Sequence, residues 1–180
     1  MALAHTKIYT KDDYYNLPED TRAELIDGQI YYQAAPSRIH QRLLNDLHGT
    51  IYNYIKSSNG SCQVYPAPFA VKLSDDGENI VEPDISVICD HNKLTDKGCS
   101  GAPDWIIEIV SPVSRTMDYY NKLFKYRATG VLEYWIVDHE RDLVTVYNFR
   151  NDSAANYAFT DNIPVGIYPG FYINVSTLNI

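Results

Sequence analysis

Two strongly apolar segments, separated by a stretch long enough for a helix, place the tightest constraint on the fold of this chain. DWIIEIVS covers residues 104–111, and EYWIVD covers residues 133–138. Both are rich in β-branched and aromatic residues, which indicates strands buried on two faces. Between them, Ser114 or Thr116 can cap a helix that runs through YYNKLFKYRAT to Gly130. The pattern therefore predicts a strand, a crossover helix and a second, parallel strand.

The rest of the chain predicts two more helices and several short strands. Thr10 precedes a short helix that ends before Pro18, and Ser37 caps a long helix with apolar residues at the 3.6-residue period. Asp27-Gly28 between apolar runs is typical of a β-hairpin. Further strands are expected at CQVYP, FAVKL, DISVICD, DLVTVYNF, NYAFT and FYINV, whereas HNKLTDKGCSGAP has the composition of a loop. This order favours an α/β fold, a mixed central sheet flanked by helices, with an N-terminal hairpin and extra C-terminal strands.

Composition indicates an ordinary globular protein. The chain has 180 residues, 45% of them hydrophobic and 21% charged, which suits a single domain over residues 1–180. No apolar run is long enough to span a membrane, and the first residues lack a signal-peptide core. Three cysteines, Cys62, Cys89 and Cys99, are odd in number and lack CxxC spacing. We therefore expect neither a disulfide framework nor a zinc site. The same cysteine usage favours a cytoplasmic location.

The charge distribution is uneven. A net charge of −8 argues against a nucleic-acid partner. However, residues 91–127 carry six basic and four acidic side chains and are net positive, whereas residues 1–90 and 128–180 are net negative. The sequence also holds 16 tyrosines, a residue type that can stack on bases or sugars.

Two carboxylates break the apolar pattern of the predicted strands. Asp84 begins DISVICD, and Glu108 lies inside DWIIEIVS. A carboxylate in such a strand is costly unless it is paired, protonated or bound to a cation. If the two strands are neighbours, Asp84 and Glu108 face one cleft, where a divalent cation that prefers oxygen ligands could bridge them. The alternative is a structural ion pair with an arginine or lysine.

The crossover helix adds a lysine to these carboxylates. Asp118, Lys122 and Tyr126 follow one another at four-residue intervals and share one helical stripe. A lysine there can fold back toward the preceding strand. Carboxylates, a metal ion and a lysine are what phosphodiester hydrolysis requires. The alternative for Lys122 is a surface salt bridge with Asp118.

These motifs together resemble one family. VEPDISVI, PDWIIEIVSP, the spaced D-x3-K-x3-Y, GVLEYWIVD and the N-terminal ELIDGQI are similar to the bacterial Uma-two family of restriction-endonuclease-like proteins, over about residues 10–175. That family is part of the PD-(D/E)xK nuclease superfamily. The resemblance implies a mixed sheet flanked by helices and an Mg²⁺-dependent endonuclease, with Mn²⁺ as a substitute, acting on nucleic acid and most simply on DNA.

The resemblance also implies roles for particular residues. Asp84 and Glu108 match the acidic residues that bind metal and act in catalysis. The superfamily's lysine belongs two residues after Glu108, where this chain has Val110, and Lys122 matches a lysine that has moved onto the helix. Glu24 is similar to an additional acidic residue that assists the metal site. Motif positions without an assigned role are matched by His40, Asp118 and Tyr126.

Two other functions fit the residues less completely. A non-catalytic nucleic-acid-binding or assembly module would suit the negative charge. A glycosidase would use Asp84 and Glu108 in a tyrosine-rich cleft but would leave Lys122 without a task. For a nuclease that cuts duplex DNA, a homodimer is expected, because two-fold symmetry places one site on each strand.

Overall fold

The computed structural model describes residues 7–74, 78–110 and 117–178. Its larger sheet has six strands in the order β12-β11-β10-β9-β6-β3. β9 and β10 run parallel, and the other neighbours are antiparallel. The predicted mixed sheet and the parallel crossover pair are therefore confirmed. The strands are β3 (Gln63–Pro66), β6 (Ile85–Ile88), β9 (Trp105–Val110), β10 (Glu133–Asp138), β11 (Leu143–Asn148) and β12 (Ser153–Ala158).

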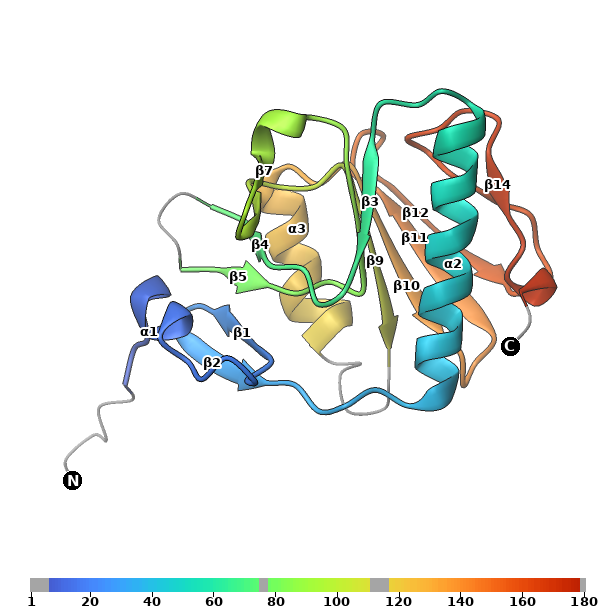
Figure 1. Cartoon of the computed structure of the whole chain (residues 1–180). Coiled ribbons are helices and arrows are strands. Elements are labelled where there is room, and N and C mark those ends of the chain that lie inside the picture. Colours follow the sequence, from blue (N-terminus) through green and yellow to red (C-terminus); the bar gives the residue numbers. More distant parts are fainter. Residues whose placement is uncertain (1–6, 75–77, 111–116, 179–180) are drawn as a thin grey trace.

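Helices cover both faces of this sheet (Figure 1). The long helix α2 (Arg38–Ser57) packs its buried leucines and isoleucines against one face, where Trp105 and Trp135 form the centre of the core. On the other face lies α3 (Leu123–Thr129), which continues from the π-helical segment η2 (Met117–Lys122). The predicted crossover helix thus exists, although its first described turns are wound more loosely. Its expected capping residues, Ser114 and Thr116, lie outside the described residues.

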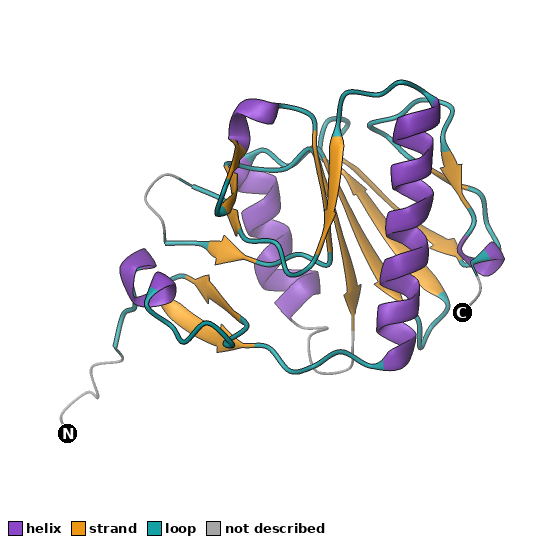
Figure 2. Cartoon of the chain, viewed as in Figure 1, coloured by secondary structure: helices purple, strands orange, loops and turns teal. Residues whose placement is uncertain are grey.

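A second six-stranded sheet, in the order β2-β1-β5-β4-β8-β7, packs on the same side as α3. Figure 2 shows how short most of its strands are. The loop composition of HNKLTDKGCSGAP concealed β7 and β8, because strands of two or three residues are too short to show an alternating pattern. The strands are β1 (Ala23–Ile26), β2 (Gln29–Tyr32), β4 (Val71–Lys72), β5 (Ile80–Val81), β7 (Leu94–Thr95) and β8 (Gly98–Ser100).

The predicted N-terminal elements are present. Thr10 caps α1 (Lys11–Tyr15) with a reciprocal capping box involving Asp13. Asp27 and Gly28 both have positive φ and join β1 to β2, as expected for an Asp-Gly hairpin. The remaining described elements are η1 (His91–Lys93), β13 (Ile163–Pro164), β14 (Tyr172–Ile173) and η3 (Val175–Thr177).

The expectation of unpaired cysteines is wrong. Cys62 and Cys89 form a disulfide between the ends of β3 and β6. Gln63 pairs with Ile88 in these antiparallel strands, so Cys62 and Cys89, one residue further along, lie opposite each other. Neither the number of cysteines nor their spacing in the sequence could reveal this strand pairing. Cys99 is free and buried, and burial raises the pKa of its thiol to about 11. The argument from cysteine use to a cytoplasmic location therefore loses its basis.

No helix in the described part of the chain combines the length and apolar character needed to cross a bilayer.

One buried carboxylate in the larger sheet lies apart from the predicted site. Glu133 accepts hydrogen bonds from the indole N–H of Trp135, at 2.6 Å, and from the backbone N–H of Ile167, at 2.9 Å. Burial raises the pKa of Glu133 above its ordinary value, although these hydrogen bonds act in the opposite direction.

Candidate functional site

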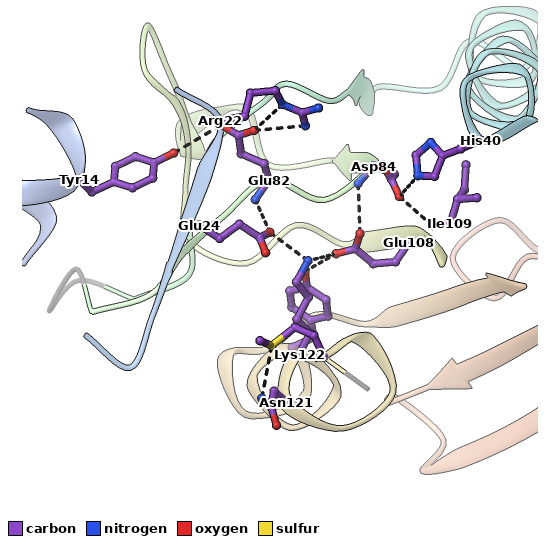
Figure 3. A network of polar contacts seen from close by, with 12 residues as sticks. Tyr14, Arg22, Glu24, His40, Glu82, Asp84, Glu108, Ile109, Asn121 and Lys122 are labelled. Atoms are coloured by element: carbon purple, nitrogen blue, oxygen red, sulfur yellow. Dashed lines mark hydrogen bonds and ion pairs between the residues drawn. The ribbon is translucent and has the colours of Figure 1, made fainter. Parts of the chain in front are cut away.

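Glu24, Glu108 and Lys122 meet in the space between the two sheets and the crossover helix (Figure 3). Lys122 Nζ lies 2.9 Å from Glu24 Oε1 and 2.9 Å from Glu108 Oε1. All three residues are only 4% exposed. The alternative of a surface lysine is therefore wrong, because the helix turns Lys122 toward the sheets rather than toward solvent. The side chain of Asp118, its proposed surface partner, is not among those described.

Asp84 lies beside Glu108, as predicted from neighbouring strands. β6 and β9 are antiparallel, and the pairing of Ile85 with Ile107 puts Asp84 opposite Glu108. The backbone N–H of Asp84 points toward Glu108 Oε2 at 3.4 Å. The backbone N–H of Ile109 donates to Asp84 Oδ2 at 2.8 Å, which fixes the orientation of the carboxylate.

His40 and Tyr126, which match motif positions without an assigned role, complete the site. Tyr126 is fully buried, and its hydroxyl donates to Glu108 Oε1 at 2.8 Å. His40 Nε2 lies 3.2 Å from Asp84 Oδ2. Burial acts to lower the pKa of His40, but the hydrogen bond and negative charge of Asp84 outweigh it, so the pKa is raised.

A second layer of polar residues, to which the sequence motifs assign no role, holds Glu24. The backbone N–H of Glu82 donates to Glu24 Oε1 at 2.8 Å. The Glu82 carboxylate lies 3.4 Å from both Arg22 and the Tyr14 hydroxyl. Burial raises the pKa of Glu82, and the charge of Arg22 opposes that shift. These partners are 60 and 68 residues from Glu82, so no local spacing pattern marks them.

The donor set suits a magnesium ion bound by few protein ligands. Mg²⁺ is commonly held by one or two carboxylates and keeps several waters. Asp84 keeps 16% of its side chain exposed, and within the described residues its Oδ1 makes no hydrogen bond. Asp84 and Glu108 therefore offer neighbouring carboxylates. No three acidic, histidine or cysteine side chains among the described residues form a metal-binding group, so a direct third contact from Glu24 stays a prediction.

The mixed sheet, the helix on each face and the paired acidic residues near a lysine define the restriction-endonuclease-like fold. A solved structure shares that fold over nearly the whole chain: a protein of Anabaena variabilis described as "a putative nuclease belonging to DUF820". It superposes with a TM-score of 0.77 at 21% identity, covering 94% of this chain and 96% of that one.

The sequence then assigns the chain to a particular family within this fold. Residues 11–176 match the model of the Uma2 family, whose description is "Putative restriction endonuclease", and the chain belongs to that family. The resemblance seen in the sequence motifs is thus confirmed. A relative in Synechocystis sp., the uncharacterised protein slr1290, is 24% identical over 144 residues, which cover 78% of this chain and 74% of the relative.

Proposed function

We propose that this protein is a Mg²⁺-dependent endonuclease that hydrolyses phosphodiester bonds in DNA. The observation that carries the proposal is the buried ammonium group of Lys122, which lies 2.9 Å from Glu108 Oε1. The other oxygen of the same carboxylate, Glu108 Oε2, lies 3.4 Å from the backbone nitrogen of Asp84. Membership of a restriction-endonuclease family and the fold shared with the Anabaena variabilis protein support a nuclease. Metal dependence is inferred from the chemistry of these side chains, and DNA as the substrate is inferred from the description of the family as restriction endonucleases.

Each residue has a task that follows from its contacts. Asp84 and Glu108 would hold the metal ion, which, when bound, neutralises phosphate charge and lowers the pKa of a coordinated water. Glu24 and Glu108 hold the Lys122 ammonium group beside the proposed metal ligands, where it would stabilise negative charge that develops in the transition state. Tyr126 fixes the Glu108 carboxylate, and His40 together with the Ile109 N–H fixes Asp84.

This arrangement favours hydrolysis of a phosphodiester over hydrolysis of a sugar. A glycosidase needs one carboxylic acid to donate a proton and the other to act as a base or nucleophile. Here Glu108 accepts hydrogen bonds from both Lys122 and Tyr126 on one oxygen. Such contacts favour the ionised carboxylate, which suits a metal ligand better than a proton donor.

Cleavage of supercoiled plasmid and of single-stranded DNA, with and without Mg²⁺, tests the activity directly. Lys122→Met should lower the cleavage rate by roughly 10²–10³, the scale for one lost transition-state charge. Lys56→Met is the matched control, because Lys56 is exposed near the far end of α2. Circular dichroism must show that both variants are folded at the assay temperature. Equal rates for Lys122→Met and the parent would contradict the proposed role of the lysine.

Metal binding is tested separately by calorimetric titration with Mn²⁺. Asp84→Asn and Glu108→Gln should each abolish binding, because each removes a charged oxygen ligand. A non-catalytic module would show DNA binding that weakens with salt but no metal-dependent cleavage in any variant. Retained Mn²⁺ binding in both variants would show that the ion, if required, binds elsewhere.

A two-fold homodimer is part of the proposal for duplex DNA, since symmetry would bring one site to each antiparallel strand. Analytical ultracentrifugation at micromolar concentration should show a dimer. A monomer that still cuts both strands of a duplex would remove this part of the proposal.

A further inference from the structure

Tyr31 lies beside the site on the edge of the second sheet. β1 and β2 pair antiparallel with Glu24 directly opposite Tyr31. Directly opposed residues project from the same face, with Cβ atoms about 4.5–5.5 Å apart. Because the Glu24 carboxylate reaches Lys122, the Tyr31 side chain also projects on the side of the hairpin that faces the site.

The ring of Tyr31 is accessible, unlike the carboxylate that it opposes. Tyr31 is 39% exposed, whereas Glu24 is 4% exposed. β2 is the edge strand of its sheet. Within the described residues, Tyr31 takes part in no hydrogen bond, ring stack or cation–π contact, so its aromatic face is available to a bound molecule.

Three of the described basic side chains near the site are paired with carboxylates. Lys122 contacts Glu24 and Glu108, Arg22 contacts Glu82, and Lys125 contacts Asp27 of the hairpin turn. The whole chain has a net charge of −8. These ion pairs leave less free positive charge for phosphate contacts, the usual source of affinity for duplex DNA. Base stacking on an aromatic ring supplies affinity without positive charge and tolerates any base.

We propose that Tyr31 stacks on an unpaired base next to the phosphate that is cut, so the preferred substrate is single-stranded DNA. The inference rests on the proposed nuclease function and makes its substrate class more specific. A base inside a duplex is covered by its neighbours and can offer its face only after it is unstacked. A flap, a bubble or a free strand offers that face at no such cost.

The adjacent residue, Tyr32, provides a matched control. It lies opposite Ala23, so it projects from the other face of the same hairpin, and it is 70% exposed. Tyr32 thus has the same side chain as Tyr31, lies on the same strand and is more exposed, but it faces away from Lys122. If removal of any surface tyrosine weakened binding, the variants at both positions should lose affinity equally. If Tyr31 stacks on a base at the site, only the variant at Tyr31 should lose affinity.

The test measures binding without turnover. Fluorescence anisotropy with Ca²⁺ in place of Mg²⁺ compares a labelled oligodeoxythymidine with a duplex of the same length. The parent should bind the single strand more tightly. Tyr31→Ala should weaken that binding about tenfold or more, the scale for one lost stacking partner. Tyr31→Phe and Tyr32→Ala should bind as the parent does.

Several outcomes would overturn the proposal. They are tighter binding of the duplex, an unchanged affinity in Tyr31→Ala, an equal loss in Tyr32→Ala, or no binding of the oligodeoxythymidine. If Tyr31→Ala does not fold, Tyr31→Leu keeps apolar area but removes the aromatic face, and parent-like binding by that variant counts equally against stacking. Single-strand binding that depends on Tyr31, without metal-dependent cleavage, would refute the nuclease function and leave the stacking role intact.

Discussion

Replacing Lys122 with methionine removes a buried positive charge from between two carboxylates. Lys122, Glu24 and Glu108 are each 4% exposed, and both N–O distances are 2.9 Å. Removing one partner of a buried ion pair typically costs about 3–5 kcal/mol, because the remaining charge stays desolvated without compensation. We expect Lys122→Met to lose about that much free energy of unfolding at neutral pH and without divalent metal. For a chain of this size, that corresponds to a fall in melting temperature of roughly 6–20 °C.

Urea unfolding followed by circular dichroism measures this loss. Lys56→Met, on the exposed surface of α2, should change the free energy of unfolding by less than about 0.5 kcal/mol. The double variant Lys122→Met/Glu24→Gln should recover part of the stability, because it removes one of the two uncompensated charges. If Lys122→Met costs no more than Lys56→Met, the ammonium group is not held between the carboxylates, and the reasoning for the whole site fails.

Three further predictions concern other buried groups. Tyr126→Phe should lower the free energy of unfolding by about 1.5–3 kcal/mol, the scale for a hydrogen bond to a charged group, here Glu108, as measured in urea. Folding raises the pKa of Glu133, so protonation of this carboxylate favours the folded state. The free energy of unfolding of the parent, relative to that of Glu133→Gln, should therefore fall as pH rises through the folded-state pKa of Glu133. Urea unfolding at a series of pH values would contradict this if the difference stayed constant or rose. Thiol titration of the unreduced, denatured protein should find one free thiol, that of Cys99, whereas three would exclude the inter-strand disulfide.

The larger sheet was predictable because its strands carry strong local signals. DWIIEIVS and EYWIVD are too apolar for anything but a buried position, and the intervening helix requires them to be parallel. Asp84 and Glu108 were identifiable as candidate site residues for the same reason, since a carboxylate stands out in an apolar strand.

Other parts of the site depend on contacts between distant segments. His40 is 44 residues from Asp84, and Glu24 is 58 residues from Glu82. No periodicity connects such pairs. The burial of Lys122 likewise depends on how α3 and η2 are rotated against the sheets, and the four-residue spacing alone is compatible with an exposed face as well as a buried one.

The proposed position of the catalytic lysine on the helix agrees with how the two sheets pack. Val110, the position at which the sequence resemblance led us to expect a lysine, is completely buried and belongs to the apolar cluster between the larger sheet and α3. A side chain there starts from the same strand as Glu108. Lys122 instead approaches from the helix and reaches Glu108 of the larger sheet and Glu24 of the second sheet at equal distances. Because Glu24 belongs to the hairpin, the lysine loses one of these two carboxylate contacts unless the hairpin is docked. The N-terminal hairpin is therefore a component of the candidate site rather than an appendage to it.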